Sequence, residues 1–149
     1  MKTLADLRIT PALPDDLPEV LSLLERNQLM TSDVEAHLRN FVIARDGAVA
    51  VACGGAEAYQ FAALLRSIAV DPEYRGMGLG RRIVRELLDR LSSRGLREFY
   101  LLTEGAEEFF RKRGFKVIDR DQIHPQLLSS SQLQGACPES ATCMRLVMS

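Results

Sequence analysis

The stretch RGMGLGRR, from Arg75 to Arg82, places glycine at every second position between arginines. It follows a nearly continuous apolar run over 62–70, which the Asp71-Pro72 pair ends because proline cannot donate to a strand ladder. It precedes the strongest helical pattern of the chain, over 78–94. The apolar face of that predicted helix consists of Leu79, Ile83, Leu87, Leu88 and Leu91. The loop therefore joins a predicted buried strand to the start of a predicted amphipathic helix.

A loop of this kind suits an anion. The first N–H groups of a helix are unpaired and carry about half a positive charge. Glycine at 76, 78 and 80 lets an oxyanion approach the backbone and permits left-handed φ angles, while Arg75, Arg81 and Arg82 add positive charge at the rim. The alternative is an ordinary glycine-rich turn. No Gly-Lys-Ser/Thr follows, and the loop lies after the middle strands, which argues against a nucleoside triphosphate or a nicotinamide dinucleotide.

The elements predicted outward from the loop alternate between strands and helices. Asp46-Gly47 predicts a hairpin, and Thr31 or Ser32 is the expected N-cap of a helix to about residue 40, with Glu35 completing a capping box. The predicted strands cover 5–10, 41–45, 48–59, 62–70, 98–103, 115–118 and 143–148, and the predicted helices begin at Pro14 and near 31, cover 78–94 and 106–113, and include a weaker one over 125–134. This order predicts one α/β domain over 1–149, a mixed sheet with helices on both faces.

Composition limits the classes of partner. The chain has 149 residues, 46% of them hydrophobic, and a domain of this size buries roughly 70% of its unfolded surface without a metal or disulfide. A net charge of -1, from 19 basic and 20 acidic residues, favours neither nucleic acid nor an acidic membrane. No signal-like or membrane-spanning apolar segment occurs, so we expect a soluble cytoplasmic protein. Three cysteines, an odd number, indicate reduced thiols.

The segment LLRSIAVDPEYRGMGLGRRIVRELL resembles the acetyl-CoA-binding segment of the GNAT-type N-acetyltransferases, whose pattern is Arg or Gln, two residues, Gly, one residue, then Gly or Ala. Arg75, Gly78 and Gly80 match it, and AEEFFRKRGF resembles the family's second cofactor segment. The resemblance covers essentially the whole chain. It implies a mostly antiparallel sheet in which two parallel central strands, ending near Val70 and Thr103, splay apart around pantetheine.

Acetyl-CoA is the co-substrate that this resemblance implies. The pyrophosphate would lie on the backbone amides of the glycine loop, and a backbone N–H at Ala69-Val70 would polarise the thioester carbonyl. The cofactor-binding residues so implied are Ile68, Ala69, Val70, Arg75, Gly76, Met77, Gly78, Leu79, Gly80, Arg81, Thr103 and Phe110.

Two positions depart from the family. Many members have a glutamate base and a tyrosine acid where this chain has Leu64 and Phe110, and neither of these can move a proton. The acceptor amine must then be neutral when it binds, which holds for roughly a tenth of an α-amine of pKa near 8 at pH 7 but for far less of a lysine-like amine. Substitute acids or bases acting through water are Glu57, Tyr59, Tyr100 and Glu104, which the sequence does not rank.

Three basic side chains are candidates for substrate binding. Arg66 lies in an apolar run and requires an anionic partner. That partner is either a substrate carboxylate, phosphinate or arsenical oxyanion, or an internal acid such as Glu57 or Glu104. Arg45 and His37 either line the mouth of the site or are solvated surface residues.

The segments ALLRSIAV, LREFYLLTEGAEEFF and CPESATCMRL together resemble the small arsenic-resistance N-acetyltransferases. This resemblance implies a role in detoxification, with an amino-acid-like amine as acceptor, including arsenic- or phosphorus-containing amino-acid toxins. Cys137 and Cys143 suggest a metalloid site, but their spacing fits no common zinc pattern, and we expect no metal.

The sequence thus predicts an N-acetyltransferase that transfers acetyl directly to a small primary amine, because no cysteine near the loop indicates an acyl-enzyme. Acetylation of a protein lysine or N-terminus remains an alternative, as does a non-catalytic CoA-binding or thiol–metalloid sensor. Many family members are dimers, which leaves a homodimer open, with the last strand, 143–148, as a candidate contact.

Overall fold

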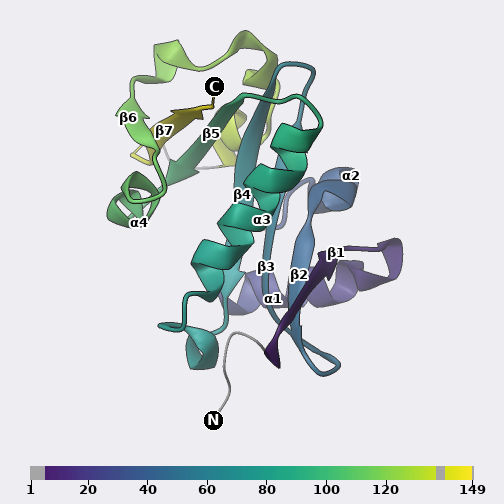
Figure 1. Ribbon diagram of the computed structural model, residues 1–149. Coiled ribbons are helices and arrows are strands. Elements are labelled where there is room, and N and C mark those ends of the chain that lie inside the picture. The colour runs from purple at the N-terminus through teal and green to yellow at the C-terminus, as the bar shows by residue number, and fades with distance from the viewer. Residues whose placement is uncertain (1–5, 137–139, 149) are drawn as a thin grey trace. The chain divides into compact units, whose positions relative to one another are not determined.

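The computed structural model describes residues 6–136 and 140–148. Its seven-stranded sheet has the order β1-β2-β3-β4-β5-β7-β6 (Figure 1). The strands are β1 (Arg8–Pro11), β2 (Val42–Asp46), β3 (Val49–Ala58), β4 (Ala62–Val70), β5 (Glu98–Thr103), β6 (Lys116–Ile118) and β7 (Thr142–Val147). β4 and β5 are parallel, whereas β1 with β2, β2 with β3, β5 with β7 and β6 with β7 are antiparallel. The predicted α/β fold with a mixed, mostly antiparallel sheet is confirmed.

The chain forms two compact units. The first contains the chain up to Ala56 together with Ser67–Arg90, and the second contains Glu57–Arg66 together with the chain from Leu91 onward. The first unit carries α1 (Leu17–Arg26), α2 (Val34–His37) and most of α3 (Leu79–Ser93). The second carries α4 (Glu107–Arg111).

Within the first unit, helices cover both faces of the strands (Figure 1). Cys53 of β3 packs with α1 and α2 residues in one buried cluster. A Cβ built on the next residue, Gly54, would lie 2.5 Å from Ile83 of α3. Because successive strand residues point to opposite faces, α1 and α2 lie on one face and α3 on the other.

The second unit has its own core. Leu64 of β4 and Tyr100 of β5 pack with Leu127, which follows the strands in sequence. The parallel ladder joins Ala62–Leu64 to Glu98–Tyr100, and both strands run on beyond it. The phenyl rings of Phe110 and Phe115, 5.8 Å apart, pack α4 against the start of β6.

Two helix predictions are wrong in detail. The helix expected over 31–40 is the short α2 followed by the 3-10 turn η3 (Leu38–Asn40), and its N-cap is Asp33, at φ +60 without a side-chain cap. The capping box therefore does not form. The region 125–134 contains the 3-10 turn η6 (Pro125–Leu127) and the start of a π-helical turn, Gln132–Ala136, because local bonds such as Gln126 N–H to His124 Nδ1 replace a regular helix.

The last strand lies inside the sheet. β7 lies between β5 and β6, and its backbone is engaged by both. The predicted strand 143–148 is therefore confirmed, with bounds Thr142–Val147, and its role as a homodimer contact stays a prediction. In the described part of the chain, no helix has the length and apolarity needed to cross a membrane.

Candidate functional site

The glycine loop lies between the 3-10 turn η4 (Pro72–Tyr74) and α3, as predicted. Gly76 and Gly78 both have φ +83, and a Cβ on either would meet no atom within 4 Å. The first helical bond runs from Arg82 N–H to Gly78 O, so the N–H groups of Leu79, Gly80 and Arg81 precede it. The loop thus presents left-handed glycine backbone, open space and a helix N-terminus together, which suits the pyrophosphate of CoA.

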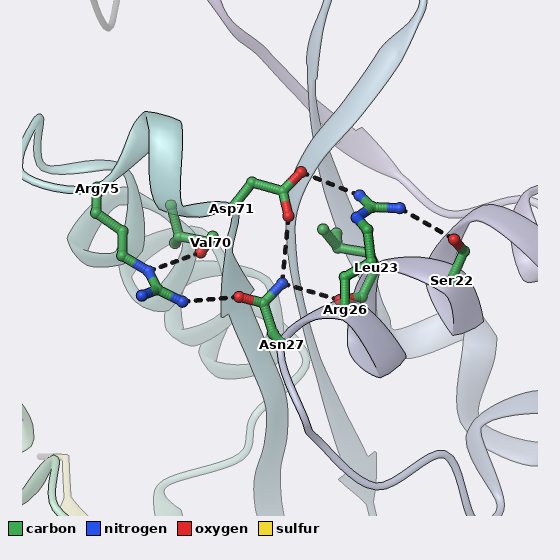
Figure 2. Close-up of polar contacts among 7 residues, drawn as sticks. All are labelled: Ser22, Leu23, Arg26, Asn27, Val70, Asp71 and Arg75. Carbon is green, nitrogen blue, oxygen red and sulfur yellow. Dashed lines mark hydrogen bonds and ion pairs between the residues drawn. The ribbon is translucent and has the colours of Figure 1, made fainter.

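Two of the arginines beside the loop donate hydrogen bonds to oxygens of the protein. Arg75 donates through Nε to the Val70 carbonyl at 3.0 Å and through a terminal nitrogen to Asn27 Oδ1 at 2.8 Å (Figure 2). Arg82 donates to the Leu7 carbonyl at 3.4 Å. These acceptors are uncharged, so both guanidinium groups keep their positive charge beside the loop, and their contact with a phosphate stays a prediction. Arg81 is exposed, and Met77 is half-buried.

The end of β4 contains a feature that the sequence analysis missed. Ser67 has φ +59 in the middle of this strand. A left-handed residue re-aims the peptide groups that follow it, here those of the predicted acetyl-binding residues Ile68, Ala69 and Val70. Cys53 Sγ donates to the Ser67 carbonyl at 3.4 Å, and burial raises the pKa of this thiol to about 12. The one available signal was a serine interrupting an apolar run.

Arg66 has an internal partner. It donates to Glu57 Oε2 at 2.7 Å, and the side chains are 2% and 1% exposed. Tyr59 donates to the other oxygen, Glu57 Oε1, at 2.8 Å. Burial, together with this hydrogen bond to Glu57, raises the pKa of the Tyr59 phenol, while a hydrogen bond with Ser130 opposes the rise. The structure therefore shows the internal acid Glu57 as the partner of Arg66, and both oxygens of this carboxylate accept a hydrogen bond.

The other candidate acids, bases and cofactor contacts of the second unit lie on or after β5. Tyr100 is buried and donates to Glu98 at 2.8 Å, and burial raises the pKa of its phenol. Glu104 is exposed and accepts from Ser140 at 2.9 Å. Thr103 is half-buried opposite Thr142, and Phe110 is 7% exposed within the aromatic packing of α4.

Arg45 is held by two acids of the first unit. It donates to Asp16 at 2.8 Å and to Glu19 at 3.2 Å, beside the start of α1. These ion pairs fix the Arg45 guanidinium beside α1, and its contact with a substrate stays a prediction. His37 ends α2 and is half-buried.

Only one of the two cysteines predicted as a metalloid pair lies among the described residues. Cys143 is buried, and burial raises its pKa to about 11, whereas Cys137 lies outside the described residues. Among the residues that the structure describes, no three His, Cys, Asp or Glu side chains are grouped as a metal site. A surface cavity of about 390 Å³ between β6 and β7, with Lys116 and Arg145 in its wall, includes no residue predicted for the site.

The fold and the loop agree with the comparison to known proteins. The family model described as the Acetyltransferase (GNAT) family matches residues 4–115, and the chain belongs to this family. It is therefore an acetyl-CoA-dependent N-acetyltransferase of the GNAT type.

Three proteins of known name or structure are similar to this chain. An uncharacterized N-acetyltransferase of Chlorobaculum tepidum is 30% identical over 113 residues, 75% of this chain and 70% of that protein. The amino-acid acetyltransferase of Aeromonas salmonicida is 27% identical over 55% of this chain. N-acetylglutamate synthase from Neisseria gonorrhoeae, solved with coenzyme A and N-acetyl-glutamate, superposes on 96% of this chain with a TM-score of 0.81 at 18% identity. The chain spans only 19% of the Aeromonas protein and 35% of the Neisseria protein.

Proposed function

We propose that this protein acetylates the α-amino group of a small amino acid or amino-acid analogue, by direct transfer from acetyl-CoA. The observation that carries the proposal is its relation to amino-acid acetyltransferases, together with a fold shared with a synthase solved with N-acetyl-glutamate. Analogues that carry a phosphinate or arsenical group are included in this class, as the resemblance of the segments ALLRSIAV, LREFYLLTEGAEEFF and CPESATCMRL suggests.

In this proposal the glycine loop holds the pyrophosphate. The amides of Leu79, Gly80 and Arg81 would face it, and the open side of Gly76 and Gly78 leaves room for the phosphates. Acetyl-CoA supplies an activated thioester, and the chain supplies orientation, which is worth several kcal/mol in effective-molarity estimates. The Ala69-Val70 backbone, re-aimed after Ser67, is proposed to polarise the thioester carbonyl.

Proton transfer is proposed to depend mainly on the substrate. Leu64 and Phe110 are buried hydrocarbon groups, so the amine would enter neutral and attack the thioester carbon without a protein base at these positions. As the C–N bond forms, the C–S bond would break and CoA would leave as a thiolate, which takes up the proton that the amine loses. Of the four candidate groups, Tyr59 and Glu104 are the two whose side chains are not fully buried, and we assign any water-mediated proton transfer to them. Tyr59→Phe and Glu104→Gln separate their contributions to kcat.

A mass-spectrometric assay of acetyl-CoA turnover tests the acceptor. The panel comprises free amino acids, phosphinate and arsenical glutamate analogues, aminoglycosides, polyamines and a lysine peptide. Acetylation confined to the amino-acid-like compounds supports the proposal. Acetylation of the peptide alone would replace the acceptor with a protein amine. Tight acetyl-CoA binding without any product would instead indicate a CoA-binding sensor.

A further inference from the structure

Arg75, beside the expected phosphate site, is held by uncharged oxygens. Its two acceptors are the carbonyl of Val70, at 3.0 Å, and the amide oxygen of Asn27, at 2.8 Å (Figure 2). Neither acceptor carries charge, so these bonds fix the guanidinium without neutralising it. One comes from the strand before the loop, and the other comes from 48 residues earlier in the chain, at the end of α1.

The orientation of the Asn27 amide is set by its other partners. Its Nδ2 donates to the Leu23 carbonyl at 2.9 Å, within the last turn of α1, and to Asp71 Oδ1 at 3.3 Å. With its nitrogen facing two acceptors, Asn27 must direct its oxygen at Arg75. The helix stops here because Gln28 follows at φ +60. An aspartate in this position would have no donor and would face the Asp71 carboxylate.

Asp71, just after the strand before the loop, also contacts the end of α1. Its backbone N–H donates to the Val51 carbonyl at 2.9 Å, and its carboxylate also binds Arg26, at 3.0 Å. The network therefore ties the end of α1 to the residues on which the glycine loop begins, Val70–Asp71 and Arg75 (Figure 2). Beyond Arg75 come Gly76 and Gly78, whose backbone freedom is costly to restrict on binding.

We propose that Asn27 is a positioning residue for acetyl-CoA: by fixing Arg75 it orders the start of the glycine loop before the cofactor binds. The inference rests on the proposed assignment of this loop as the pyrophosphate site. Asn27 acts through Arg75 and touches no phosphate itself. Its effect is therefore confined to ligands that carry the pyrophosphate, which a merely structural role at the end of α1 would not produce.

The test compares two ligands by isothermal titration calorimetry: CoA, and pantetheine, which lacks the pyrophosphate. Asn27→Ala removes a hydrogen bond to the charged Arg75, a loss of about 10- to 100-fold if it is passed on to CoA binding, and is expected to leave pantetheine binding within about two-fold. Arg75→Lys keeps the charge but loses the fork that reaches both acceptors, and it is expected to weaken CoA binding similarly. The Asn27→Ala/Arg75→Ala double variant should bind CoA no more weakly than Arg75→Ala alone.

Arg97→Ala is the matched control, because Arg97 also donates to two backbone carbonyls, those of Ser92 and Leu96, and it should leave CoA binding unchanged. Unchanged CoA binding in Asn27→Ala, an equal loss for both ligands, or additive effects with Arg75→Ala would each overturn the inference. If Asn27→Ala does not fold, Arg75→Lys carries the same test. Gly78→Val tests whether the glycine loop binds the pyrophosphate. If this variant binds CoA normally, the assignment of the loop as the pyrophosphate site fails. If Gly78→Val weakens CoA binding and Asn27→Ala does not, only the inference about Asn27 fails.

Discussion

The guanidinium of Arg66 and the carboxylate of Glu57, 2.7 Å apart, form an ion pair whose side chains are only 2% and 1% exposed. The two residues lie on neighbouring strands, β4 and β3, and Tyr59 donates to the same carboxylate. Each of the two buried charges thus has an opposite charge within hydrogen-bonding distance, which offsets part of its desolvation cost.

Removing one partner of this pair should be strongly destabilising. Arg66→Ala or Glu57→Leu removes the opposite charge from a buried group, and breaking a buried ion pair in this way typically costs about 3–5 kcal/mol of unfolding free energy. The double variant Arg66→Met/Glu57→Leu should lose much less than the sum of the single losses. Urea denaturation of the four proteins measures this. Single variants within about 1 kcal/mol of the wild type would show that the pair contributes little.

Gly55 should not tolerate even one methyl group. A Cβ there would lie against the ring of Phe41, in the buried cluster that includes α1 and α2. Gly55→Ala should therefore cost about 1–3 kcal/mol, the usual range for overpacking. Gly47→Asn is the control, since Gly47 has open space around it and asparagine tolerates its φ of +62. Equal denaturation midpoints for the two variants would refute the close packing.

The buried thiols should be inert at neutral pH and should make the fold alkali-sensitive. Burial raises the pKa of Cys53 to about 12 and of Cys143 to about 11, from 9.0. A raised thiol pKa favours the neutral form in the folded state. Its contribution to stability is therefore complete below pH 9 and falls as the pH rises toward 11–12.

Peptide mapping after iodoacetamide treatment at pH 8 should find both thiols much less modified in the native protein than in urea. Cys53→Ala should lose less stability than the wild type between pH 8 and pH 10. Native-state modification of Cys53 at the unfolded rate would contradict the burial.

The pH dependence of catalysis should follow the acceptor under the proposed function. With Leu64 and Phe110 unable to move a proton, kcat/KM should rise with pH and level off near the pKa of each amine. Two amino-acid acceptors that differ in amine pKa should give correspondingly displaced profiles. A shared inflection for both acceptors would reveal a protein base instead.

Local signals predicted most of the fold. Asp46-Gly47 gives the hairpin between β2 and β3, with Gly47 at φ +62, and the strands 62–70 and 98–103 have the predicted bounds. The prediction failed where side chains compete locally with the backbone pattern. Asp33 takes the N-cap of α2 in a left-handed conformation, which neither Thr31 nor Ser32 signals.

The glycine loop could be predicted because its chemistry lies in consecutive residues. The hydrogen-bond partners of the loop's side chains could not be predicted. Arg75 contacts Asn27, 48 residues away, and no sequence spacing encodes that bond. For Arg66, the kind of partner could be predicted but not its identity. Its need for an acid followed from its apolar surroundings, but only the structure selects Glu57 over a substrate anion.

The two outermost strands are the shortest of the sheet, four residues in β1 and three in β6. β1 ends in Pro11, which has no N–H to offer, and β6 begins with the exposed Lys116. Short, charged or proline-containing borders are poor templates for foreign strands. The protein should consequently resist edge-to-edge polymerisation at high concentration, although Val117 and Val147 are exposed beside one border.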